Sequence, residues 1–194
     1  MYIFLLFVVL VLAVYLWSVY NKFVTLKTRI KASIQEIGNQ LKRQADLIPN
    51  LVESAKAYMK HEKTIFDKLT EARKRIITAT DGGDLGEMIK ASESLTKALA
   101  PINALMESNP QLKAAETVAK LMEELRDTAD KVMYSRRTLI DLSADYNIMT
   151  VAFPSSLVAK LFKFEQEKGL ETSLDGGALK VSAEETKTPK VKLD

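Results

Sequence analysis

The residue types that most often carry out chemistry are scarce in this sequence, and the most suggestive group is His61-Glu62. A histidine followed by a glutamate begins the HExxH helix of zinc proteases, in which the second histidine lies four residues after the first. Ile65 occupies that position here, and the chain has no other histidine and no cysteine. No complete set of nitrogen or sulfur ligands can therefore be assembled. We predict that the protein binds no metal ion and no cofactor.

Charged groups offer two further candidates for a site. Asp46 precedes a proline and has Lys42 and Arg43 one helical turn before it, which is typical of a helix cap with i,i+3 and i,i+4 ion pairs. Residues 135–137, Ser-Arg-Arg, could hold a phosphate or a lipid head group, although a solvated helix face explains them nearly as well. No glycine-rich phosphate-binding loop is present. We therefore predict no catalytic residues, no enzymatic activity and no small-molecule substrate.

The overall charge argues against nucleic-acid binding. The 194 residues include 28 basic and 25 acidic side chains, which are mixed along the chain and leave a formal charge of +3. Such mixing is typical of a solvated surface and not of a basic patch that follows a phosphate backbone.

The N-terminal segment, residues 1–20, contains no charged side chain. As an α-helix that rises about 1.5 Å per residue, it would span about 30 Å, the thickness of the hydrocarbon core of a bilayer. A cleaved signal peptide is the alternative, but the segment has no basic start and no small-x-small cleavage site. We therefore predict a transmembrane anchor over residues 1–20.

Basic residues follow the anchor directly, with Glu36 as the single acid among them up to Arg43. By the positive-inside rule this flank stays in the cytoplasm and the extreme N-terminus faces outward. Basic side chains close to an anchor are also suited to lipid head groups. We predict such contacts for Lys22, Lys27, Arg29 and Lys31.

The chain after the anchor has the periodicity of helices. Glycine and proline interrupt it at Asp81-Gly82-Gly83, Asn109-Pro110 and Phe153-Pro154, and no stretch alternates like a strand. Asn109 is expected to cap a helix that starts at Pro110, and Pro154 to open a short last helix with Leu157, Leu161 and Phe164. We predict a helical bundle over residues 21–171, followed by a disordered tail over residues 172–194.

Pro49 lies within an apolar pattern that keeps one heptad phase from Ile30 to Ile76. An unshifted phase favours one long helix that Pro49 kinks, which leaves the carbonyl of Ala45 unpaired. Alternatively, Asp46 caps a new helix at this point, and residues 21–79 form an antiparallel hairpin. Both alternatives are compatible with an all-α fold in which a transmembrane helix precedes an antiparallel, up-and-down four-helix bundle with long helices.

Two blocks of the sequence resemble the LemA family of bacterial single-pass membrane proteins. The first is QLKRQADLIPNLVESAKAYMKHEK at residues 40–63, with Tyr20-Asn21 before it; the second starts at NALMESNPQLKAAE and ends at FPSSLVAKLF. The resemblance covers residues 20–165. It implies a single N-terminal transmembrane helix and a four-helix bundle, with some relatives encoded near membrane proteases and others on magnetosome membranes.

These observations favour a membrane-anchored helical scaffold without catalytic activity, at the cytoplasmic face of a bacterial inner membrane. It would present its bundle to protein partners or to a second copy. The alternatives are a membrane-shaping or lipid-sensing protein and, less favoured, a hydrolase or metal enzyme. The segment around Pro49 combines apolar residues on more than one face with a cap or kink, and we predict partner contacts there, or else packing of Leu47 and Leu51 against residues 151–164. The predicted interaction residues are Asp46, Leu47, Ile48, Pro49, Asn50 and Leu51.

Overall fold

The computed structural model describes residues 1–59 and 62–167, and within these ranges all regular structure is helical. The predicted all-α class is therefore confirmed, whereas the predicted tail at 172–194 lies outside the described residues. The helices are α1 (Tyr2–Lys56), α2 (Lys63–Gly82), α3 (Leu85–Ser108), α4 (Pro110–Ala114), α5 (Glu116–Val151) and α6 (Ser155–Phe162).

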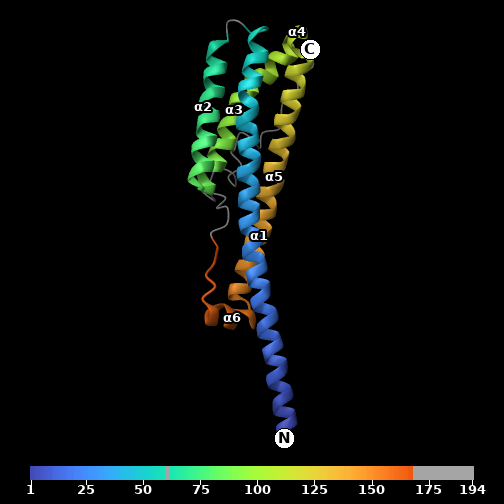
Figure 1. Ribbon diagram of the computed structural model, residues 1–194, viewed down its shortest axis with the longest axis vertical. Coiled ribbons are helices and arrows are strands. Elements are labelled where there is room, and N and C mark those ends of the chain that lie inside the picture. The colour runs from blue at the N-terminus through green and yellow to red at the C-terminus, as the bar shows by residue number, and fades with distance from the viewer. Residues whose placement is uncertain (60–61, 168–194) are drawn as a thin grey trace, which may run out of the picture.

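The first helix, α1, joins the predicted anchor to the soluble part without a break. Its 55 residues correspond to a length of about 80 Å, and Figure 1 shows its N-terminal part extending beyond the other helices. Pro49 lies inside α1, so the alternative in which a new helix starts there is wrong. The chain instead turns between Lys56 and Lys63, although residues 57–62 contain neither glycine nor proline. The heptad phase of the apolar residues is thus the same in α1 and in α2, although the chain reverses between these helices. The heptad phase therefore did not reveal where the chain turns.

Local capping residues set the starts of α3 and α4. Asp84 Oδ1 accepts a hydrogen bond from the Glu87 backbone N–H over 2.8 Å at the start of α3. Asn109 Oδ1 accepts from the backbone N–H groups of residues 111 and 112 at the start of α4, as the sequence predicts. Gly83 ends α2 in the left-handed region, with φ 71°. The helix expected from Pro110 is divided, because extended backbone at Ala115 separates α4 from α5.

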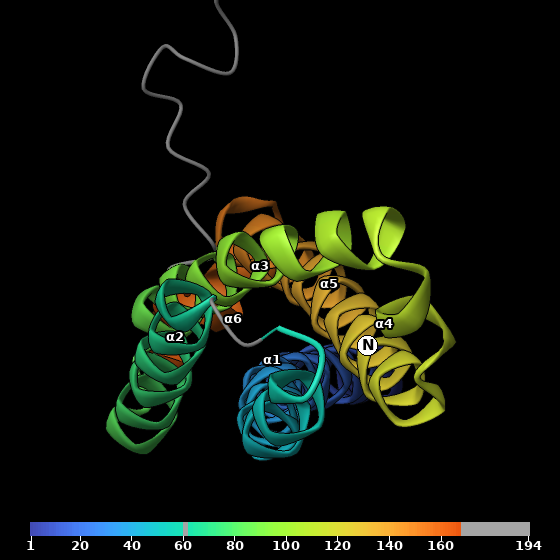
Figure 2. The same cartoon turned by 90° about the horizontal axis from the view of Figure 1, so that it is seen from above.

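Helices α2, α3 and α5 pack along the part of α1 that follows Phe23. Figures 1 and 2 show α2 and α5 on opposite sides of α1, with α3 beside α2. The start of α5 lies beside the later part of α1, where Arg43 pairs with Glu124, and its end lies beside Phe23, whose ring contacts Tyr146. Helix α6 lies near the end of α5 and beside the lower part of α1.

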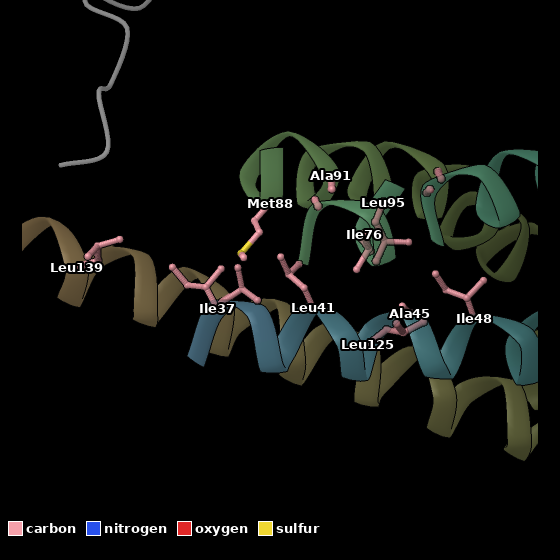
Figure 3. Packing of buried hydrophobic residues seen from close by; sticks show 14 of the residues in the cluster. Ile37, Leu41, Ala45, Ile48, Ile76, Met88, Ala91, Leu95, Leu125 and Leu139 are labelled. Carbon is pink, nitrogen blue, oxygen red and sulfur yellow. The ribbon is translucent and has the colours of Figure 1, made fainter. Parts of the chain in front are cut away.

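The hydrophobic core begins at Phe23, which is fully buried, and continues to the far end of α1. Burying each large aliphatic side chain contributes roughly 1.5–3 kcal/mol. Below Phe23, residues 1–14 are all exposed although they are almost entirely apolar. Figure 3 shows side chains from four helices that meet in this core: Ile37, Leu41, Ala45 and Ile48 of α1, Ile76 of α2, Met88, Ala91 and Leu95 of α3, and Leu125 and Leu139 of α5.

Candidate functional site

The Pro49 segment contains a hydrogen bond that the sequence did not predict. Pro49 has no N–H to donate to the carbonyl of Ala45, four residues earlier in α1. Arg73 of α2 takes this role, because its Nε–H donates to the Ala45 carbonyl oxygen over 3.0 Å. Ala45 is fully buried, so an unpaired carbonyl there would cost roughly 1–3 kcal/mol. The expectation of an unpaired carbonyl is therefore wrong, and a neighbouring helix supplies the missing donor.

The turn of α1 before Ala45 connects this helix to both of its long neighbours. Asp46 lies inside α1 and caps no helix, and the two basic residues before it pair with other helices. The expected local ion pairs of Asp46 are therefore replaced by tertiary ones. The links are Lys42 Nζ to Asp81 of α2 over 3.0 Å, Arg43 to Glu124 of α5, and Gln44 Nε2 to the Leu125 carbonyl oxygen over 3.4 Å.

The six predicted interaction residues divide between the core and the surface. Ile48 and Leu51 are buried, and Leu47 is partly buried against the core. Asp46, Pro49 and Asn50 are exposed. The surface of this segment is therefore mostly polar. The alternative packing against residues 151–164 does not occur, because that region contacts α1 near Tyr20 and Phe23, about 40 Å away along the helix.

An aromatic cluster joins α1, α5 and the residues around the end of α6. The Phe164 ring stacks on Phe23 with centroids 4.6 Å apart and an interplanar angle of 15°. The Phe162 ring meets Tyr20 edge to face at 4.9 Å, and Tyr146 meets Phe23 in the same manner at 5.5 Å. Aromatic pairs of this kind contribute about 0.5–1.5 kcal/mol beyond the area they bury. The cluster therefore fixes α6 at the point where the apolar segment of α1 ends.

Polar contacts hold the chain after α6 in the same place. The Asn147 side chain donates from Nδ2 to the Glu167 carbonyl and accepts from the Glu167 N–H, both over 2.9 Å. The Glu167 carboxylate pairs with Lys27 Nζ over 3.1 Å, and this hydrogen bond and charge raise the pKa of Lys27 above its ordinary value. Burial raises the pKa of Tyr146, whose hydroxyl has no hydrogen-bond partner among the described residues.

The four predicted head-group contacts follow the apolar segment as expected, but they differ in their surroundings. Lys22, Arg29 and Lys31 are exposed. Lys27 is engaged by Glu167. The sequence did not predict the contact between Asn147 and Glu167, because it depends on the reversal of the chain between α5 and α6. The aromatic cluster had one signal in the sequence, the two phenylalanines of Phe162-Lys163-Phe164.

The described part of the chain contains charged side chains that could be considered for a metal or substrate site. No group of three or more acidic or histidine side chains there could hold a metal ion, and His61 lies outside the described residues. A surface depression between α2 and α3 contains charged side chains that pair within their own helices. These pairs are Arg75 with Glu71 over 3.2 Å and Lys90 with Glu87 over 2.8 Å.

The described elements define an all-α protein with one N-terminal helix that is long and apolar enough to cross a membrane, by length and composition. The chain belongs to the LemA family, whose family model matches residues 33–192. This match confirms the resemblance seen in the two sequence blocks.

A comparison with curated proteins finds that the chain is similar to a magnetosome protein. The chain is 24% identical over 170 residues to the magnetosome protein MamQ of Magnetospirillum gryphiswaldense. The matched region covers 76% of this chain and 62% of MamQ, so the chain spans less than two thirds of the length of that relative.

Proposed function

We propose that this protein is a non-enzymatic, membrane-anchored scaffold of the bacterial inner membrane. Residues 1–20 span the membrane once with the N-terminus outside, and an antiparallel four-helix bundle made by α1, α2, α3 and α5 stands in the cytoplasm. The bundle presents its surface to a protein partner or to a second copy. Pairs of contacts support the antiparallel order. Along α2, Arg73 meets Ala45 and the later Asp81 meets the earlier Lys42 of α1. Along α5, Glu124 meets Arg43 and the later Tyr146 meets the earlier Phe23.

The observation that supports an interaction role best is an apolar stripe on the outer face of α5. Met133, Ile140, Ile148 and Val151 are between 44% and 66% exposed. At 100° per residue these four positions fall within about 80° of one another, and they extend over about 27 Å of helix. The exposed Arg137 lies on the same face between Met133 and Ile140, so the apolar surface is interrupted by one basic side chain. Exposed apolar side chains that gather on one face are typical of protein interaction sites. We call these four residues the α5 stripe.

A pair of charged substitutions in the α5 stripe tests the scaffold role. Ile140→Asp combined with Ile148→Asp should abolish complexes larger than the monomer in native gels of solubilised membranes, because a buried carboxylate is costly in an apolar interface. Thr78→Asp, an acidic change at an exposed site of α2, is the matched control and should leave the complexes intact. Unchanged complexes in the double variant, or a native protein that is monomeric throughout, would contradict the proposal.

The exposed part of the Pro49 segment, Asp46 and Pro49 with Asn50, is a second proposed contact region. It lies far from the anchor along α1 and therefore projects away from the membrane surface. Asn50→Asp tests this region, since the side chain is exposed and its change should leave helicity intact. Loss of assembly without loss of helicity would support a contact here, and assembly like that of the unchanged chain would exclude Asn50.

The anchor and its orientation are tested separately. The protein should stay in the membrane fraction after high-salt and carbonate washes, because an apolar helix that spans the bilayer is not released by charge screening. Protease added to intact cells should leave the C-terminal part uncut. Release by carbonate would exclude the span, and cleavage in intact cells would reverse the orientation.

A membrane-shaping role is the second candidate function. It is favoured by the apolar residues that α6 exposes beside the end of the anchor, and by the similarity to a protein named as a magnetosome protein. Full-length protein reconstituted into vesicles of different diameter should then alter vesicle shape or prefer the smaller vesicles. Equal incorporation into small and large vesicles, with unchanged vesicle shape, would exclude the membrane-shaping role and leave the scaffold as the proposed function.

A further inference from the structure

We propose that α6 is an interfacial helix, which lies in the head-group region of the bilayer leaflet from which the soluble part emerges. The occupant of its exposed apolar edge is therefore lipid. This inference rests on the anchoring included in the proposed function, but it does not depend on the scaffold role.

The exposed side of α6 and the turn before it, which contains Phe153, have the composition of an interfacial helix. Phe153, Leu157 and Leu161 follow one another at intervals of four residues and are 82%, 58% and 67% exposed. Val158 and Ala159 are buried on the side that faces the protein. An amphipathic helix with large apolar residues on one side is suited to the boundary between head groups and acyl chains. We call Phe153, Leu157 and Leu161 the α6 edge.

The position of α6 along α1 places this edge at the membrane boundary. Tyr20 is the last residue of the predicted anchor, and the centroid of its ring lies 4.9 Å from that of Phe162. Within the otherwise exposed residues 1–20, only Tyr15 and Val19 are partly buried against the core. Packing thus reaches down to Tyr15, about 7 Å below Tyr20 at 1.5 Å per residue, which is the depth at which interfacial helices lie. Figure 1 shows α6 at this lower end of the helical array, beside α1.

The charges around α6 complement an anionic lipid surface. Lys160 and Lys163 are exposed at its C-terminal end, and Lys22 is exposed on α1 two residues after Tyr20. Glu165 is an exposed acid nearby, so the local balance is basic but not uniformly so. Basic side chains next to an apolar edge attract anionic head groups while the apolar edge contacts the acyl chains.

The contacts of α6 leave it little freedom to turn its edge away from the membrane. Phe164 stacks on Phe23, and the Glu167 backbone is held at both its N–H and its carbonyl by Asn147. The ion pair between Lys27 and Glu167 adds a third attachment to α1. The orientation of the edge is therefore determined by the same contacts that join α6 to the end of the anchor.

Depth-dependent fluorescence quenching of the full chain tests this inference. Because the chain has no cysteine, single variants Leu157→Cys and Leu161→Cys can each be labelled with an environment-sensitive dye in vesicles of phosphatidylethanolamine and phosphatidylglycerol. We expect both labels to be quenched by lipids that carry a spin label near the head group. Val14→Cys, in the anchor, should be quenched by a label deep in the acyl chains, and Gln111→Cys, exposed on α4, should not be quenched.

The possible outcomes separate this inference from the proposed anchor. Quenching at Val14→Cys without quenching at Leu157→Cys and Leu161→Cys would overturn the interfacial helix and leave the anchor intact, whereas loss of quenching at Val14→Cys would overturn the anchor itself. A shift of the emission at Leu157→Cys without lipid quenching would show that protein covers the edge, which also overturns the inference.

A second variant tests whether the apolar edge causes the insertion. With the reporter at Phe153→Cys, the added changes Leu157→Asp and Leu161→Asp should abolish quenching by the shallow spin label. Both leucines are exposed, so the helical content of the variant should match that of the unchanged chain. Quenching that persists at Phe153→Cys in this variant would refute the role of the edge.

Discussion

The hydrogen bond between Arg73 and the Ala45 carbonyl should make a measurable contribution to stability because Pro49 is present. Arg73→Met keeps much of the aliphatic side chain but removes the donor, which leaves a buried carbonyl without a partner. A hydrogen bond from a charged group contributes roughly 1.5–3 kcal/mol. We therefore expect Arg73→Met to lower the free energy of unfolding by about 2 kcal/mol.

The contribution of Arg73 should nearly vanish when Pro49 is replaced. Pro49→Ala restores a backbone N–H that can donate to the Ala45 carbonyl, so the carbonyl no longer depends on Arg73. In this background we expect Arg73→Met to cost less than about 1 kcal/mol, a coupling of about 1–2 kcal/mol between the two positions. Pro49→Ala alone should stabilise by only about 1 kcal/mol. The usual interior penalty of proline, about 3 kcal/mol, is reduced here by the bond from Arg73 and by the smaller entropy of the unfolded chain.

Urea unfolding of the full chain in detergent micelles, followed by far-ultraviolet circular dichroism, measures all four proteins of this cycle. Arg75→Met is the matched control, because Arg75 is exposed and, among the described residues, its ion pair is with Glu71 of its own helix. Such a pair contributes about 0.3–0.5 kcal/mol, and the control should change stability by no more than that. An equal cost of Arg73→Met with and without Pro49 would refute the reasoning, since the bond would then be unrelated to the proline.

Three further perturbations follow from the structure and can be measured in the same unfolding assay. Gly38→Ala should stabilise by about 0.5–1 kcal/mol, because the added Cβ would lie 3.8 Å from the Met88 side chain, an ordinary contact, within a helix; a loss of stability would contradict this. Tyr146→Phe should be neutral or stabilising by up to about 1 kcal/mol, since it removes a buried hydroxyl without a partner among the described residues. The pKa values of Lys27, which pairs with Glu167, and of Tyr146 are raised in the folded state, so the unfolded state loses these protons first as the pH rises. The free energy of unfolding should therefore be constant near neutral pH and fall above about pH 10. A free energy of unfolding that stays constant above about pH 10 would contradict both raised pKa values.

The sequence predicted features that depend on neighbouring residues in the chain. The apolar segment up to Tyr20, the cap at Asn109 and the turn at Gly83 follow from composition, side-chain hydrogen bonds or backbone conformation within a few residues. The family resemblance was visible for the same reason, because its motifs are continuous stretches of sequence. These features could therefore be predicted from the sequence without knowledge of the fold.

The sequence alone determined that the chain is helical, that its first 20 residues are apolar and that one apolar stripe continues past Pro49. Only the tertiary structure decided that Pro49 lies inside α1, because the donor that replaces its missing N–H comes from Arg73 on another helix. It also placed the chain reversal between Lys56 and Lys63, where no glycine or proline marks a turn. Periodicity shows which residues share a face, but it does not show what covers that face. That is why the sequence placed Leu157 and Leu161 on a short last helix but did not show that both are exposed in the fold.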